Sequence, residues 1–362
     1  MSRSWAARRA DSSSRPSAAA SGARPATPRA GELPTGTGYA PCHHGELLQG
    51  VFLDDDGRRC AGLVTLPMAG PGSTAAFTRR PGTAPEALTV LPADRTKAAR
   101  AAALAVAECA RRTGAPACGG EVRLTCDVPV GLGMGSSTAD VIATVRAVAD
   151  SYGLRLPVDT VARLAVRAEL ACDPLMLDGR PVLFAQREGR VLEVLGPALP
   201  PLVVVGCALG GGAPVDTLSL PVREVGDGDV RAFERLRTLL RRAVATGDVH
   251  RLGEVATASA RRGQQALGHP EFDALTGIAR QAGAVGVQIA HSGAVAGVLF
   301  DPAAPELRHR VRGCRGALDA QGIPATRTFT TTKELLNGPA HRGVDRPAGP
   351  DTPRRPARLP AL

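Results

Sequence analysis

Two periodicities follow each other in the middle of the chain. Apolar and polar residues alternate over residues 121–126, as they do in a strand with one buried face. Apolar residues then recur at helical spacing at Val141, Val145 and Val148. A glycine-rich segment lies between the two runs, so the pattern predicts a strand, a loop and a helix in succession.

Further runs of the same kinds predict elements on both sides of this unit. A continuous apolar run over residues 202–207 is typical of a buried strand, and Gly114 and Pro116 end a preceding alanine-rich helix. Together they predict a mixed α+β chain. We expect helices at residues 97–112, 156–170, 230–246, 250–267, 272–282 and 306–320, and strands at residues 60–76, 182–195, 285–290, 295–300 and 325–330.

The two ends of the chain lack such periodicity. Residues 1–30 carry a net charge of +5 and residues 338–362 carry +3, which leaves +2 of the total +10 for the middle. This distribution, with only 3% aromatic residues, argues against nucleic-acid binding by a folded surface. The first tail has the composition of a transit peptide but no amphipathic helix, so we expect disordered basic tails or an over-long start.

The remaining composition points to a cytoplasmic protein. The eight cysteines are scattered without a CxxC pair, which is typical of buried thiols in a reducing compartment. No apolar run approaches the length of a membrane-spanning helix. We therefore expect no membrane partner, and the sequence does not predict an oligomeric state.

The loop between strand and helix carries the strongest chemical signal. Gly131, Gly133 and Gly135 alternate with larger residues and permit backbone conformations that other residues resist. They lead into a helix N-terminus, which favours anions, and Ser136, Ser137 and Thr138 add hydroxyls. A P-loop would have Lys where Ser136 stands, and the glycine spacing of the dinucleotide fingerprint is absent. The alternative is a glycine-rich turn that Ser136 or Ser137 caps.

Three segments resemble motifs of the GHMP kinases. Pro129-x-x-x-Gly133-x-Gly135-Ser136-Ser137-Thr138-Ala139 resembles the second motif, usually P-x-x-x-G-L-G-S-S-A-A. The run Gly45-Glu46-Leu47-Leu48-Gln49-Gly50 is similar to the first motif as the L-threonine kinases of cobalamin synthesis have it, although His43-His44 replace their Ser-Cys pair. Residues 291–300 resemble the third motif.

The resemblance covers residues 38–336 and implies the two-domain GHMP kinase fold. It implies an N-terminal ATP-binding domain at residues 37–195, similar to the second domain of ribosomal protein S5. It also implies a ferredoxin-like C-terminal domain at residues 196–336. Residues 1–36 and 337–362 remain as tails.

The same resemblance implies an ATP- and Mg²⁺-dependent kinase acting on a small hydroxylated molecule. Ser137 and Glu169 would hold Mg²⁺, and Asp173 would be the catalytic base with Ser137 as a second catalytic residue; the alternative for Asp173 is an ordinary Asp-Pro turn. The residues implied at the ATP phosphates are Pro129, Gly131, Leu132, Gly133, Met134, Gly135, Ser136, Ser137, Thr138 and Ala139.

For the substrate site the resemblance implies residues from four separate segments. Glu46 and His44 come from the first motif, Asp216 and Thr217 from a loop after the buried strand, and Ser292 and Gly293 from the third motif. Turn formation is the alternative for the last two pairs. L-threonine is the expected substrate. Homoserine or another small alcohol, and a non-catalytic nucleotide-binding protein, remain as alternatives.

Overall fold

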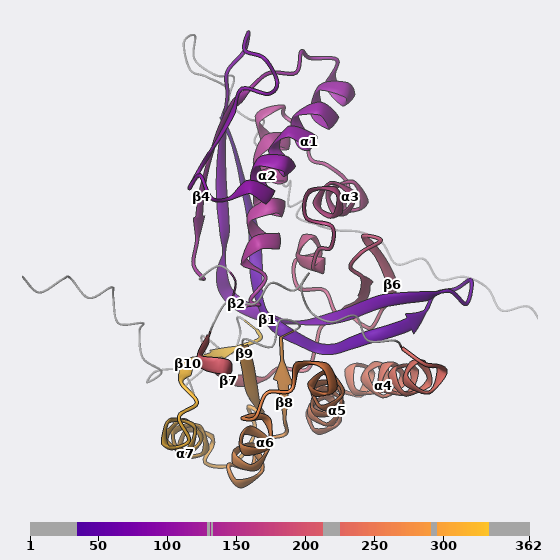
Figure 1. Cartoon of the computed structure of the whole chain (residues 1–362), viewed down its shortest axis with the longest axis vertical. Helices are drawn as coiled ribbons and strands as arrows, with labels where there is room; N and C mark the ends of the chain where they lie inside the picture. The colour runs from indigo at the N-terminus through magenta and orange to yellow at the C-terminus, as the bar shows by residue number, and fades with distance from the viewer. Residues whose placement is uncertain (1–34, 129–130, 132, 213–224, 291–294, 333–362) are drawn as a thin grey trace, which may run out of the picture. The chain divides into compact units, whose positions relative to one another are not determined.

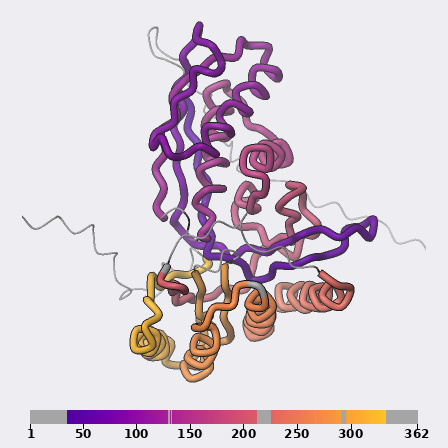
Figure 2. The backbone as a smooth tube through the Cα atoms, viewed as in Figure 1, coloured from indigo at the N-terminus to yellow at the C-terminus, as the bar shows by residue number. Residues whose placement is uncertain are grey.

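Two long strands form the frame of the protein. In the computed structural model, which describes residues 35–128, 131, 133–212, 225–290 and 295–332, β1 (Thr35–Leu53) pairs antiparallel with β2 (Arg59–Arg79). The register shifts three times between Pro41 and Leu48, as at β-bulges. Bulges bend a strand and re-aim its side chains, and Figure 2 shows both strands bending midway. The first-motif residues lie in this irregular part.

One half of the fold covers these strands with three helices. β4 (Gly120–Cys126) pairs with β2 and with β3 (Leu88–Leu91). The helices are α1 (Thr96–Thr113), α2 (Ser136–Ser151) and α3 (Val158–Glu169), and Figure 1 shows α2 along the strands. α2 approaches β1 so closely that a Cβ on Gly38 would lie 2.1 Å from the Ala143 carbonyl oxygen. The expected strand–loop–helix unit is confirmed as β4, the loop and α2.

The sheet continues into the second half of the chain. Its strand order is β10-β7-β9-β8-β1-β2-β4-β3, and a hairpin of β5 (Val182–Ala185) and β6 (Arg190–Val194) attaches to β2. The added strands are β7 (Val203–Ala208), β8 (Gly286–Ile289), β9 (Val295–Phe300) and β10 (Ala325–Thr330). The predicted domain boundary falls between β6 and β7, and this division stays a prediction.

Four helices accompany these strands (Figure 1). They are α4 (Asp227–Thr246), α5 (Val249–Leu267), α6 (Phe272–Gln281) and α7 (Leu307–Ala320), and two short 3₁₀ turns are η1 (Pro174–Leu177) and η2 (Gly210–Gly212). One apolar cluster joins β1 and β2 to α1–α3 and reaches α4 and α5, and a second joins β7–β9 to α6 and α7. Among the described helices, none has the length and apolar character needed to cross a bilayer.

Candidate active site

The glycine-rich loop delivers the chain to the N-terminus of α2. Gly131, Gly133 and Gly135 have φ of +87°, +73° and +69°, in the left-handed region that favours glycine. α2 begins at Ser136, so Ser137 and Thr138 lie in its first turn. The positive end of the helix dipole therefore faces this loop, which suits an anion such as phosphate. Pro129 and Leu132 lie outside the described residues.

Gly135 packs directly against His43 of β1. A Cβ at Gly135 would lie 2.2 Å from the His43 Cδ2 atom, far inside van der Waals contact. The His43 backbone N–H also donates a hydrogen bond to the Met134 carbonyl oxygen at 3.2 Å. The first and second motifs therefore meet, and a larger residue at position 135 would displace either the loop or the imidazole.

Glu169, the last residue of α3, faces the first turn of α2. Thr138 Oγ1 donates to Glu169 Oε1 at 2.8 Å, Ser137 Oγ donates to Oε2 at 3.3 Å, and Lys97 Nζ lies 3.8 Å from Oε2. Burial, with repulsion from Asp173, outweighs these contacts and raises the pKa of Glu169 to about 7. Hydroxyl and carboxylate oxygens are the ligands that Mg²⁺ prefers, so this cluster fits that ion.

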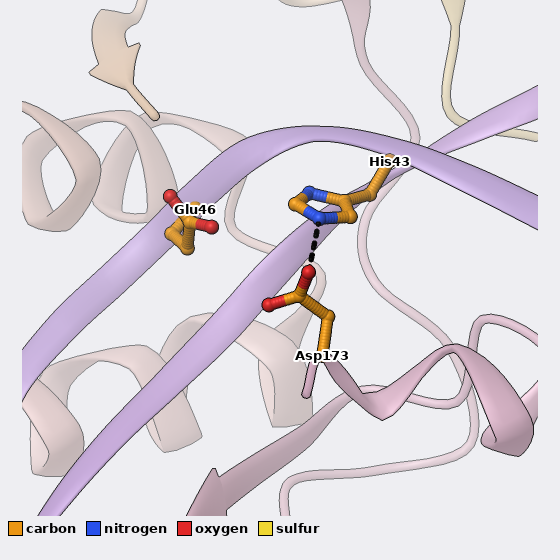
Figure 3. Close-up of side chains that lie close together, drawn as sticks. All are labelled: His43, Glu46 and Asp173. Atoms are coloured by element: carbon orange, nitrogen blue, oxygen red, sulfur yellow. Dashed lines mark hydrogen bonds and ion pairs between the residues drawn. The ribbon is translucent and has the colours of Figure 1, made fainter. Parts of the chain in front are cut away.

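Asp173, in the same cleft as Glu169, forms a hydrogen bond with His43. His43 Nε2 donates to Asp173 Oδ2 at 3.0 Å, and Nδ1 lies 3.0 Å from the Gly45 carbonyl oxygen (Figure 3). With acceptors at both ring nitrogens, the imidazole is held in its doubly protonated form. Burial alone would lower the pKa of His43, but attraction to Asp173, its hydrogen bond and the charge of Glu46 outweigh burial and raise the pKa to about 9.

Glu46 completes this group. It is buried on β1, three residues after His43, and the shifted register lets both side chains approach Asp173. The potential ligand atoms of His43, Glu46 and Asp173 all lie within 4.8 Å of one another. Figure 3 shows the His43 imidazole directed at Asp173, with Glu46 beside the pair.

These groups line one cleft of ≈ 410 Å³. It runs from the start of α1 across the glycine-rich loop to the end of α3, and Lys97, Ser137, Glu169 and Asp173 all line it. His43 also lines a larger groove of ≈ 890 Å³ along β1 and η1. His43 therefore lies where the cleft beside the glycine-rich loop meets a second space of sufficient size for a small substrate.

Of the remaining expected substrate residues, only His44 is described, and it does not join this group. His44 is fully buried on the far side of the strand, where its ring lies 4.9 Å from that of Phe329 and its Nδ1 lies 2.7 Å from Gln288 Nε2. Burial and the neighbouring charge of His43 lower the pKa of His44 to about 3. His43 stands at the cleft instead. Asp216, Thr217, Ser292 and Gly293 lie outside the described residues.

His43 and Lys97 were not among the expected site residues. Lys97 carries no motif and reaches the cleft from α1. The His-His pair in the first motif was a signal for His43, because neighbouring residues of a strand face opposite sides. The strand pattern could not say which histidine faces the cleft, because the register shifts between Pro41 and Leu48 interrupt the alternation.

Comparison with known proteins identifies a family that this chain resembles. Residues 97–175 match the family described as GHMP kinases N terminal domain, and residues 239–314 match GHMP kinases C terminal. The L-threonine kinase of Citrobacter freundii is 30% identical over 175 residues, which are 48% of this chain and 60% of that protein. That of Salmonella typhimurium is 28% identical over 202 residues, 54% of this chain and 64% of that protein. The match thus spans less than two thirds of either relative.

A solved structure has the same fold. The homoserine kinase of Cytophaga hutchinsonii superposes with a TM-score of 0.60, covering 82% of this chain and 94% of that one at 17% identity. At this identity the likeness concerns the fold alone. It confirms the expected mixed α+β, two-domain GHMP kinase architecture.

Proposed function

Because this chain belongs to the GHMP kinase superfamily, we propose that it is an ATP-dependent kinase for the hydroxyl of a small molecule. One observation carries the proposal. The N-terminus of α2, the Glu169 carboxylate and the His43–Asp173 pair converge on a single cleft. Phosphoryl transfer needs an anion cradle, a cation position and a proton acceptor, and it gains most from their positioning.

The ATP phosphates would lie along residues 131–139, against the backbone of the glycine-rich loop. Ser137 and Glu169 would hold Mg²⁺, which neutralises phosphate charge during transfer. The 3.3 Å contact between their oxygens supports this pairing. Lys97, 3.8 Å from Glu169, adds a second positive charge on the same side of the cleft.

Asp173 would accept the proton of the substrate hydroxyl. The hydroxyl oxygen forms a bond to the γ-phosphorus, the bond from that phosphorus to the β,γ-bridging oxygen breaks, and ADP leaves with the electron pair. The hydroxyl proton passes to the Asp173 carboxylate. His43 acts as a positioning residue, since its hydrogen bond fixes Asp173 Oδ2 at the cleft.

L-threonine is the substrate that we propose, with O-phospho-L-threonine as product on the route to the cobalamin side chain. The run from Gly45 to Gly50 and the similarity to two proteins named L-threonine kinase support it. Homoserine or another small alcohol is the alternative. A non-catalytic nucleotide binder is less well supported, because Ser137, Glu169 and Asp173 are all present and close together.

The test is ADP release from Mg²⁺-ATP by the purified chain with threonine, serine, homoserine and mevalonate in turn. We expect turnover with threonine and at least a 100-fold loss in Asp173→Asn if Asp173 is the base. Turnover with a different alcohol would retain the kinase and reject the substrate. ATP binding without turnover on any of the four would contradict the proposal.

A further inference from the structure

Two carboxylates and one imidazole meet in the cleft. His43, Glu46 and Asp173 come from β1 and from the turn before η1, and their ligand atoms lie within 4.8 Å of one another. His43 and Glu46 are 2% and 5% exposed, and the Asp173 side chain is 21% exposed. Two carboxylates at such a distance repel each other, and a cation beside them is stabilising, whether the His43 imidazolium or a metal ion.

The hydrogen bond at the far side of the imidazole orients it as a metal ligand. His43 Nδ1 lies 3.0 Å from the Gly45 carbonyl oxygen, so in the neutral ring Nδ1 carries the proton and Nε2 carries the lone pair. Metal-bound histidines in proteins commonly donate their second N–H to a backbone carbonyl in this way. The lone pair would point toward Asp173 and into the cleft.

The separation of the ligand atoms suits a shared ion. Nitrogen and oxygen ligands about 2.1 Å from one metal are about 3.0 Å apart at a right angle and about 3.4 Å apart at the tetrahedral angle. His43 Nε2 and Asp173 Oδ2 are 3.0 Å apart. A ligand oxygen of Glu46 also lies within 4.8 Å of both atoms.

We propose that His43, Glu46 and Asp173 bind a divalent transition-metal ion, with Zn²⁺ as the best match. One imidazole and two carboxylates form a three-ligand set that leaves a fourth position open. Mg²⁺ prefers oxygen ligands alone, which Ser137 and Glu169 supply, so the two positions differ in their chemistry. The ion replaces the proton that otherwise joins His43 to Asp173.

Occupation of this position has a consequence that rests on the proposed function. A carboxylate that ligates Zn²⁺ cannot also accept the proton of the substrate hydroxyl. Zn²⁺ therefore inhibits phosphoryl transfer even where Mg²⁺-ATP is saturating.

Binding is tested first and without turnover. The full chain, free of Mg²⁺ and ATP, is titrated with Zn²⁺ against a chromogenic chelator, and Co²⁺ is used as a spectroscopic probe. We expect one tight site, and a loss of affinity of about 100-fold or more in His43→Asn and in Asp173→Asn. Asp173 is partly exposed, so Asp173→Asn should fold even if His43→Asn does not. Thermal melts show whether each variant is folded.

Two control variants exclude other ligands. His250, exposed and 4.0 Å from Asp301, is the matched histidine, and His250→Asn should leave Zn²⁺ affinity within about twofold. All eight cysteines are described, and Cys126 is the one that is not fully buried, so Cys126→Ser should also bind normally. Equal affinity in the wild type and in His43→Asn, or a thiolate charge-transfer band with Co²⁺, would overturn the site.

Inhibition is tested second. Zn²⁺ is added to the ADP-release assay at saturating Mg²⁺-ATP, and half-inhibition is expected at the Zn²⁺ concentration that half-fills the site. Turnover that persists with the site filled would overturn the inhibitory role. If the protein binds Zn²⁺ at this site but turns over none of the substrates, the result would count against the proposed function and support the metal site.

Discussion

Gly135 offers the sharpest test of the site's architecture. An alanine there meets two obstacles. Its backbone φ of +69° is unfavourable for a residue with a Cβ and costs about 1–2 kcal/mol of stability. Its Cβ would also lie 2.2 Å from His43 Cδ2, and His43 is too buried to swing away. The glycine-rich loop or the His43–Asp173 pair must move.

Gly135→Ala should lower activity as well as stability. Displacing the imidazole removes the 3.0 Å hydrogen bond that positions Asp173, and loss of a positioned general base costs about 10²–10⁴ in rate. We therefore expect Gly135→Ala to lower kcat by about 100-fold or more, measured by ADP release with the accepted substrate. Unfolding by denaturant should show the backbone cost of about 1–2 kcal/mol plus about 1–3 kcal/mol for the overpacked contact with His43.

The other end of α2 provides the matched control. Gly153 has φ of +67°, and a Cβ there would have nothing within 4 Å. Gly153→Ala therefore carries the same backbone cost without a contact, and should lower stability by about 1–2 kcal/mol with kcat unchanged. If both variants lose the same activity, or if Gly135→Ala keeps full turnover, the contact with His43 does not matter for catalysis.

Three further predictions follow from individual contacts. Ser137→Ala should raise the Mg²⁺ concentration needed for half-maximal ADP release. The control is Ser151→Ala, because the Ser151 hydroxyl donates to the Val148 carbonyl oxygen at the other end of α2, and this variant should need no more Mg²⁺ than the wild type. The same Mg²⁺ dependence in Ser137→Ala and in the wild type would reject Ser137 as a ligand. His44→Ala removes a fully buried ring and should cost about 2–4 kcal/mol of unfolding free energy with the substrate KM unchanged, and a large rise in KM with unaltered stability would instead favour substrate contact. Hydrogen bonds from Arg111 and Arg112 lower the pKa of Glu108 from its usual 4.5 to about 2, so this stabilisation is present above about pH 4.5 and is lost as the pH falls toward 2. Glu108→Gln should therefore destabilise the protein at pH 7 and much less at pH 2.5 in denaturant melts; a pH-independent difference would contradict the ion pairs.

Local patterns were sufficient to predict most of the helices and strands. The alternation over residues 121–126 corresponds to β4, and the spacing of Val141, Val145 and Val148 corresponds to α2, because both periodicities depend on neighbouring residues. The glycines before α2 likewise signalled positive φ, which the structure has at all three positions. The pairing order of the ten-stranded sheet came from no such pattern, since β1 meets β8 more than 200 residues away.

The candidate site was less predictable for the same reason. Asp173 and His43 are 130 residues apart, and nothing in either segment specifies their contact. An ideal strand would place His43 and Glu46 on opposite faces, because they are three residues apart. The register shifts between them put both beside Asp173. The sequence thus showed which reactive side chains the chain has. It did not show that they lie together, because this depends on irregular backbone that periodicity does not reveal.

The convergence explains why cations should control this site. Glu46, Glu169 and Asp173 all border the cleft. Burial and repulsion from Asp173 raise the pKa of Glu169, whereas attraction to Asp173 and Glu46 raises the pKa of His43. A phosphoryl group that enters beside three carboxylates is repelled unless positive charge stands between them. Lys97 and Mg²⁺ would supply it beside Glu169, and the His43 imidazolium supplies it beside Asp173. Replacing that imidazolium by a neutral side chain should therefore weaken ATP binding as well as catalysis, and we expect both effects in His43→Gln. Asp173→Asn removes a negative charge instead, so it should weaken catalysis alone. Equal ATP affinity in wild type and His43→Gln would contradict this electrostatic argument.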